Sequence, residues 1–148
     1  MPDFTDYSMR DRTYRFSCGE PLWPFGFGLT YSACEITALT ADREHAECRA
    51  HNTGSRATDE VIEIYVKDNS SLLAPPNPVL AGFLRIRLEA GEERDFRIKL
   101  NEDAFTVVDE EGNRIPGSGS WTLYAGFGAP DARTETLTGK MAVTAQIG

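Results

Sequence analysis

Residues 32–148 alternate between apolar and polar side chains in short runs, and this two-residue period limits most strongly what the chain can fold into. The clearest run is 94–100, where Phe96, Ile98 and Leu100 alternate with charged residues. Successive side chains of a β-strand point to opposite faces, so such a run predicts a strand with one face in a core. We expect further strands at 33–40, 44–51, 59–68, 79–88, 105–108, 120–127 and 137–147.

Turn-forming sequences separate these runs at intervals of about ten residues, which is typical of sandwich domains. They are Asn52-Thr53-Gly54, the proline-rich loop 69–78, Ala90-Gly91-Glu92, 110–113 and Pro116-Gly117. No segment has a persuasive helical period. The pattern therefore predicts an all-β fold, an antiparallel β-sandwich of immunoglobulin type, with no helix.

The first 31 residues differ from the rest of the chain. They hold eight of the fifteen Phe, Tyr and Trp residues, together with three prolines and three glycines, and they follow neither a strand nor a helix period. We therefore expect an extended N-terminal arm at 1–31 and the sandwich at 32–148. Burying these aromatic side chains would release about as much free energy as ordering the arm costs, so the arm needs a docking surface beyond itself.

Charge and composition exclude several kinds of partner. The chain has 15 basic and 23 acidic residues and a net charge of −8. Nucleic acids and anionic membranes both require a cationic footprint, so neither is expected to bind. No apolar run approaches the ~20 residues of a membrane-spanning helix.

Three residues suggest a zinc site by type but not by position. His45, Cys48 and His51 carry ligands that suit zinc. On a strand, however, His45 and His51 share one face and Cys48 points to the other. We therefore expect an inward-facing Cys48 between two outward-facing histidines. Neither a metal ion nor an organic cofactor is predicted.

The sequence also gives no reason to expect catalysis. Retaining glycosidases require two carboxyl groups about 5–5.5 Å apart. The adjacent pairs Glu92/Glu93 and Glu110/Glu111 lie in predicted turns, where nothing sets that separation. No residue of this chain is therefore predicted to be catalytic.

Three segments together resemble one protein family. Leu22-Trp23-Pro24-Phe25-Gly26-Phe27-Gly28-Leu29-Thr30-Tyr31 resembles the stretch that leads into the C-terminal fibronectin type III-like domain of glycoside hydrolase family 3. The Asn52-Thr53-Gly54 turn with the strand after it, and the segment 78–92, resemble the next parts of the same domain. Departures are small: Phe27 stands where tyrosine is usual, and Thr58 where glycine is common.

The resemblance implies a fibronectin type III-like sandwich from a β-glucosidase or β-xylosidase. In this family the catalytic residues lie in a barrel domain and an α/β domain, and nothing in this chain matches them. The chain alone is therefore expected to be an inactive structural domain that packs on those two domains. The residues expected at that contact are Trp23, Phe25, Gly26, Phe27, Gly28 and Tyr31.

Two other possibilities remain open. Exposed aromatic side chains can also stack on sugar rings, which would make the chain a stand-alone carbohydrate-binding or adhesion module. An isolated chain could also cover its aromatic arm by forming a homodimer.

Overall fold

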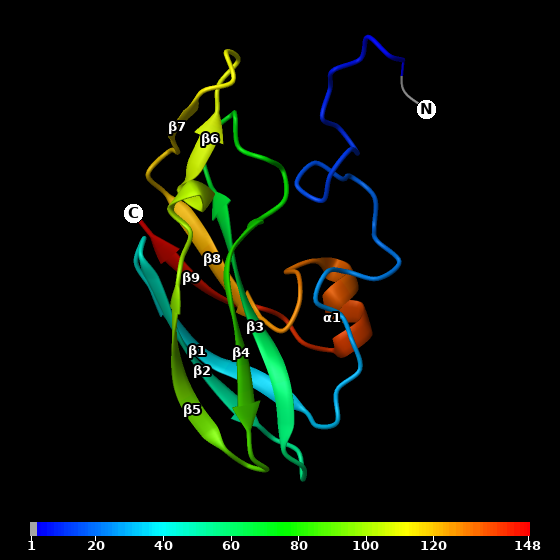
Figure 1. Cartoon of the computed structure of the whole chain (residues 1–148), viewed down its shortest axis with the longest axis vertical. Coiled ribbons are helices and arrows are strands. Elements are labelled where there is room, and N and C mark those ends of the chain that lie inside the picture. The colour runs from blue at the N-terminus through cyan, green and yellow to red at the C-terminus, as the bar shows by residue number, and fades with distance from the viewer. Residues whose placement is uncertain (1–2) are drawn as a thin grey trace.

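The structure is a computed structural model that describes residues 3–148, and its main body is formed by two antiparallel sheets packed face to face (Figure 1). The three-stranded sheet has the order β1 (Cys34–Ala41), β2 (His45–Asn52), β5 (Glu93–Lys99). The four-stranded sheet has the order β4 (Val79–Leu88), β3 (Thr58–Asp68), β8 (Trp121–Gly126), β9 (Val143–Ile147). The predicted antiparallel β-sandwich is thus confirmed.

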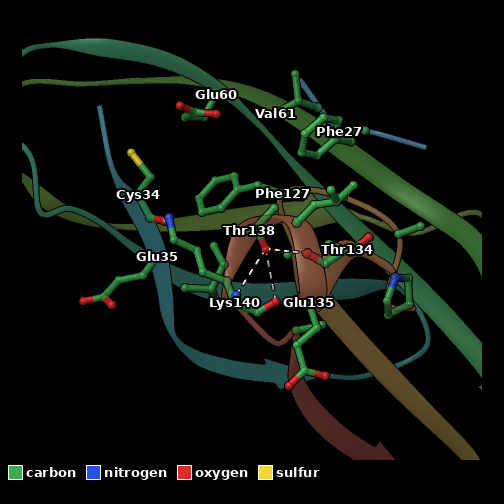
Figure 2. A pocket seen from close by; sticks show the side chains of 18 of the residues that line it. Phe27, Cys34, Glu35, Glu60, Val61, Phe127, Thr134, Glu135, Thr138 and Lys140 are labelled. Atoms are coloured by element: carbon green, nitrogen blue, oxygen red, sulfur yellow. Dashed lines mark hydrogen bonds between the residues drawn. The ribbon is translucent and has the colours of Figure 1, made fainter. Parts of the chain in front are cut away.

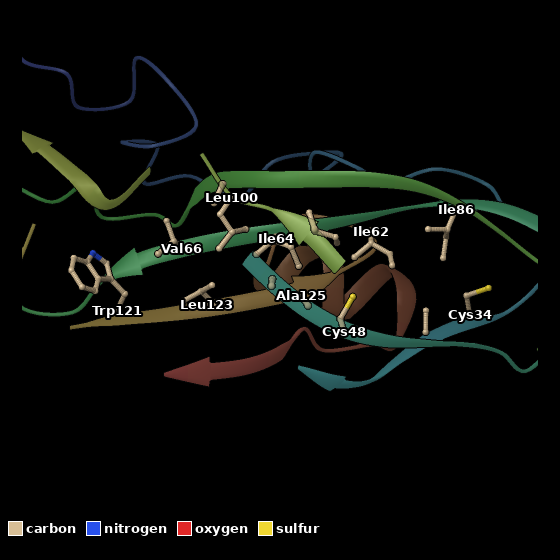
Figure 3. Packing of buried hydrophobic residues seen from close by; sticks show 14 of the residues in the cluster. Cys34, Cys48, Ile62, Ile64, Val66, Ile86, Leu100, Trp121, Leu123 and Ala125 are labelled. Atoms are coloured by element: carbon tan, nitrogen blue, oxygen red, sulfur yellow. The ribbon is translucent and has the colours of Figure 1, made fainter. Parts of the chain in front are cut away.

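The core lies between the two sheets and is built from the inward faces of their strands (Figure 3). On β3, Ile62, Ile64 and Val66 point into it, as the period of that strand predicts. Trp121 closes one end of the core, where Phe105 meets its ring edge-on at a centroid distance of 5.5 Å. The core is therefore complete without any residue of the arm.

Strand β5, which alternates most clearly in the sequence, forms as expected, but one of the three apolar side chains of the run 94–100 is less buried than the other two. Ile98 and Leu100 are buried, whereas Phe96 is only half-buried and packs against the margin of the core. The guanidinium of Arg94 lies 4.8 Å from the centroid of the Phe96 ring. Phe96 thus has the predicted direction but lies at the edge of the sandwich.

The expectation of a chain without helices was wrong. Helix α1 spans Ala132–Thr138, and a 3-10 turn, η1, spans Glu102–Phe105. Helix α1 is defined by its caps: the Asp131 carboxylate accepts a hydrogen bond from Thr134 N at 2.7 Å, and Gly139 ends it with a φ of 69°. Seven mostly polar residues are too few to display a helical period. The last strand accordingly begins at Val143 and not at 137.

The predicted strand at 105–108 also differs from its expected place. Strand β6 (Thr106–Val108) pairs only with β7 (Arg114–Pro116), and the two form a separate hairpin above the main sheets (Figure 1). Val107 is buried and Val108 is half exposed, so the side chains of this segment alternate between a buried and an exposed face as predicted.

The arm contains turns and bends but no strand or helix between residue 3 and the start of β1. Phe4 and Tyr7 are 95% and 85% exposed. Further along, the Asn77 side chain donates hydrogen bonds to the carbonyl oxygens of Tyr14 and Ser17, at 2.7 and 2.9 Å. These bonds join the arm to the loop before β4.

Candidate interdomain surface

The aromatic side chains predicted to contact other domains lie mostly on the surface. Trp23, Phe25 and Tyr31 are 67%, 65% and 87% exposed, whereas Phe27 is half-buried. The Trp23 ring stacks on Phe27 with a centroid distance of 5.2 Å and an interplanar angle of 12°. Phe27 therefore supports Trp23 from one side and leaves the rest of the indole open. Large apolar groups exposed together in this way mark an interaction surface.

Hydrogen bonds and an ion pair hold this part of the arm against the chain around α1. Ala129 N donates to the carbonyl oxygen of Phe25 at 2.9 Å. Arg133 Nε donates to the carbonyl oxygen of Leu22 at 3.4 Å, and its guanidinium lies 3.5 Å from the Glu20 carboxylate. Residues more than 100 positions apart in sequence thus fix where the exposed aromatic residues stand.

The end of the arm is joined to the beginning of β3 and the end of β2. The Thr30 hydroxyl lies 3.1 Å from that of Thr58 and also donates to the Glu60 carboxylate. Ser32 Oγ donates to Asn52 Oδ1 at 2.6 Å, and Asn52 is completely buried. A buried polar side chain requires such partners, so Ser32 contributes to the integrity of the sandwich itself.

Gly26 fits closely over a carboxyl group on the outer face of the four-stranded sheet. Its φ is 80°, and a Cβ at this position would stand 2.6 Å from Glu63 Oε1 and 2.8 Å from Gly128 Cα. Only glycine combines that conformation with that approach. Within this chain, the close approach that glycine permits at this position is to the four-stranded sheet.

Glu63 is the buried acidic group beneath this contact. It is 4% exposed, and Tyr65 donates a hydrogen bond from its hydroxyl to Glu63 Oε2 at 2.9 Å. Burial raises the pKa of Glu63 above its usual value, while the bond from Tyr65 acts in the opposite direction. Burial and the neighbouring carboxylate also raise the pKa of the Tyr65 phenol, so Tyr65 remains a donor.

A cleft of about 1230 Å³ opens between the arm, the start of β1 and α1 (Figure 2). Apolar side chains line it from three directions: Phe27 from the arm, Phe127 from the segment after β8, and Leu137 from α1. Its charged lining residues are Glu35, Asp59, Glu60, Arg85, Asp131, Glu135 and Lys140. The cleft thus has an apolar interior with more acidic than basic groups around it.

The residues weighed for metal binding lie on opposite faces of β2. Cys48 is buried in the core, while His45 and His51 are partly exposed on the other face. The predicted directions of these three side chains are thus confirmed, and they do not converge. Within residues 3–148, no group of three His, Cys, Asp or Glu side chains is placed to hold a metal ion.

Two parts of this surface were not predicted from the sequence. Glu63 lies in an apolar run between Ile62 and Ile64, and a lone acid inside such a run is the only signal that could have pointed to it. The other part is α1, whose Asp131 and Gly139 caps were the available signal.

In the described portion of the chain, no helix is long and apolar enough to cross a membrane.

Comparison with known proteins connects this arrangement to larger enzymes. Residues 60–129 match the fibronectin type III-like domain family. A β-xylosidase of Formosa agariphila is 32% identical over 86% of this chain and 19% of its own length. A xylan 1,4-β-xylosidase of Xylanibacter ruminicola is 30% identical over 93% of this chain and 17% of its own.

The solved structures agree. A family 3 β-glucosidase of Bifidobacterium adolescentis superimposes with a TM-score of 0.68 and 27% identity, over 84% of this chain and 18% of that one. The chain therefore spans less than a fifth of the length of these relatives.

Proposed function

The chain belongs to the fibronectin type III-like domains that occur in β-glycosidases of glycoside hydrolase family 3, and from this membership we propose that it is a structural part of such an enzyme. In this proposal it packs on the barrel and α/β domains of a β-glucosidase or β-xylosidase and stabilises them. The reaction belongs to those domains, and this chain supplies no catalytic residue.

One observation supports this function above the others: an aromatic surface that the arm exposes and the rest of the chain holds in place. Trp23 and Phe25 are about two-thirds exposed, yet hydrogen bonds donated by Ala129 and Arg133 fix the backbone beside them. An ordered apolar surface of this kind is suited to a permanent neighbour. The proposed contact residues remain Trp23, Phe25, Gly26, Phe27, Gly28 and Tyr31.

The geometry of β3 supports the absence of catalysis in this chain. Glu60 and Glu63 are three positions apart on a strand, so their side chains point to opposite faces. Glu60 bonds to the arm through Thr30, and Glu63 lies beneath Gly26. Neither carboxyl group is placed to face a shared sugar ring, which a retaining mechanism requires.

An assay of the purified chain tests the proposal directly. Aryl β-glucoside and aryl β-xyloside should both remain uncleaved at any protein concentration. Turnover that rises with protein concentration and disappears in a Glu63→Gln or Glu60→Gln variant would overturn it. A Glu111→Gln variant is the matched control, since Glu111 is exposed in the β6–β7 turn.

The stacked Trp23–Phe27 pair favours a second candidate function, carbohydrate binding. The open face of Trp23 offers a platform for a sugar ring. The Arg133 guanidinium, which bonds to the carbonyl oxygen of the preceding Leu22 and pairs with Glu20, is a hydrogen-bonding group in the same part of the surface. Titration with xylo- and cello-oligosaccharides while recording tryptophan fluorescence distinguishes the two functions. A structural domain gives no change, and a binding module gives a saturable change that Trp23→Ala abolishes.

A further inference from the structure

The two outer faces of the sandwich differ in their chemistry. On the three-stranded sheet, charged side chains pair across the strands: Arg49 with Asp95 at 2.7 Å, and Arg97 with Glu47 at 3.8 Å. Exposed charges that already have partners are costly to desolvate and suit contact with water. We therefore expect this face to remain exposed to solvent.

The side of the molecule that holds the cleft is different. Leu29 is fully exposed, Met141 is 75% exposed and Val61 is 40% exposed, and all three line the cleft. Phe27 and Phe127 contribute aromatic surface to the same cleft (Figure 2). At about 1230 Å³, the cleft exceeds the ~300–1,000 Å³ typical of small-molecule pockets. Its size and apolar lining suit a segment of polypeptide.

The charges around the cleft limit what that segment can be. Both basic groups of the lining are already engaged: Arg85 lies 3.2 Å from the Asp59 carboxylate, and Lys140 Nζ donates to the carbonyl oxygen of Cys34. Glu135 lies exposed on α1, and Asp131 lies at the N-terminal end of that helix. The lining carries five acidic groups and two basic ones, so the field in the cleft is negative and favours a positively charged partner.

We infer that the cleft between the arm and α1 binds a segment of the parent enzyme in which an apolar side chain lies between lysine or arginine residues. This inference rests on the proposed function, because it names the chemistry of the partner that the structural domain meets. The apolar side chain fills the space lined by Phe27, Phe127 and Leu137, and the basic groups pair with Glu135 and Asp131.

Peptide binding to the isotope-labelled full chain, followed by NMR, tests the inference. Two acetylated octapeptides serve as probes, one with leucine alternating with lysine and one with leucine alternating with glutamate. The lysine peptide should shift the amide signals of residues that line the cleft, and the glutamate peptide should not. Glu135→Lys should raise the Kd for the lysine peptide about three- to fivefold, as expected for an exposed charge pair.

The matched control is Glu111→Lys, which makes the same change of net charge on the remote β6–β7 hairpin and should leave the Kd unchanged. An equal effect of the two variants would overturn the inference, because it would show attraction by net charge alone. Equal binding of both peptides, or shifts confined to β2 and β5, would also overturn it. Concentrating the chain without peptide should shift signals of the arm but not those of α1. Shifts of α1 signals under that condition would identify a second copy as the occupant and would also overturn the inference. The glycoside assay does not involve the cleft, so failure here leaves the proposed function separately testable.

Discussion

At the scale of single residues, Gly26 determines how the arm lies on the sheet. Its backbone is in the left-handed region, and its Cα approaches the Glu63 carboxyl group and the backbone of Gly128. A side chain at this position would therefore be strained in conformation and blocked in space. The close approach of the arm to Glu63 therefore requires glycine at this position.

Gly26→Ala should weaken the contact between the arm and the four-stranded sheet and lower the free energy of unfolding by ~1–3 kcal/mol. Urea denaturation measures that loss, and faster hydrogen exchange near Phe25 and Ala129 would locate it. The control is Gly28→Ala, because a Cβ at Gly28 would meet nothing within 4 Å. Equal stability of the two variants would show that the arm does not lie on Glu63.

Glu63 should make the stability depend on pH. Its pKa is raised in the folded chain, so the unfolded chain loses the proton first as the pH rises. Stability is therefore full below the usual pKa of glutamate and declines as the pH rises towards the raised folded value. Glu63→Gln removes this decline and should gain stability relative to the parent chain as the pH increases. Urea denaturation from about pH 4 to 8 measures the difference, and parallel curves for the two proteins would contradict it.

At the scale of elements, β3 is the strand on which the fold is organised. It pairs with β4 on one side and with β8 on the other, in the middle of the four-stranded sheet. Its inward face supplies Ile62, Ile64 and Val66 to the core, and its outward face supplies Glu63 and Tyr65 beneath the arm. Both faces of this strand are thus covered along its second half.

Adjacent residues on β3 should respond very differently to truncation. Ile62 is completely buried, so Ile62→Ala should cost ~2–5 kcal/mol of unfolding free energy. Val61 points outward and is 40% exposed, so Val61→Ala should cost less than ~1 kcal/mol. Urea denaturation of both variants measures the contrast. A reversed order would mean that the strand is shifted by one residue, which exchanges its two faces.

At the scale of the whole molecule, the arm and the sandwich make separable contributions. Every buried apolar side chain of the core cluster lies at or after Cys34. The exposed large apolar side chains, in contrast, include Phe4, Tyr7, Trp23, Phe25, Leu29 and Tyr31 of the arm. We therefore expect the sandwich to fold without the arm, and we propose that the arm carries much of the surface that contacts other molecules.

Deleting residues 2–30 should leave a folded monomer, because no core residue is lost. The full chain should associate with itself through the exposed aromatic residues of the arm, since its net charge of −8 is too weak to prevent contact between apolar surfaces. Light scattering on both proteins measures the masses, and circular dichroism checks the fold. A full chain that is monomeric, with an arm readily cut by protease, would contradict this prediction and exclude the homodimer.

The sequence by itself determined the strands of the two main sheets except the start of β9, together with the sandwich and the family. The two-residue period is a local property, so β4 could be placed at residues 79–88 from its own side chains. The aromatic and glycine pattern of 22–31 is likewise contiguous, and the relatives found by comparison agree with what it implied. The direction of Cys48 between His45 and His51 followed from the same alternation.

Only the tertiary structure decided which distant segments of the chain contact and bury one another. Burial of Glu63 depends on Gly26, and the placement of the aromatic arm depends on Arg133 and Ala129, which are far away in sequence. Such contacts follow from how the sheets pack, and no local pattern encodes them. The cleft has the same origin, because the arm, β1 and α1 border it and no single segment contains it. Helix α1 was not predicted, because its seven residues show no helical period and only its two capping residues mark it in the sequence.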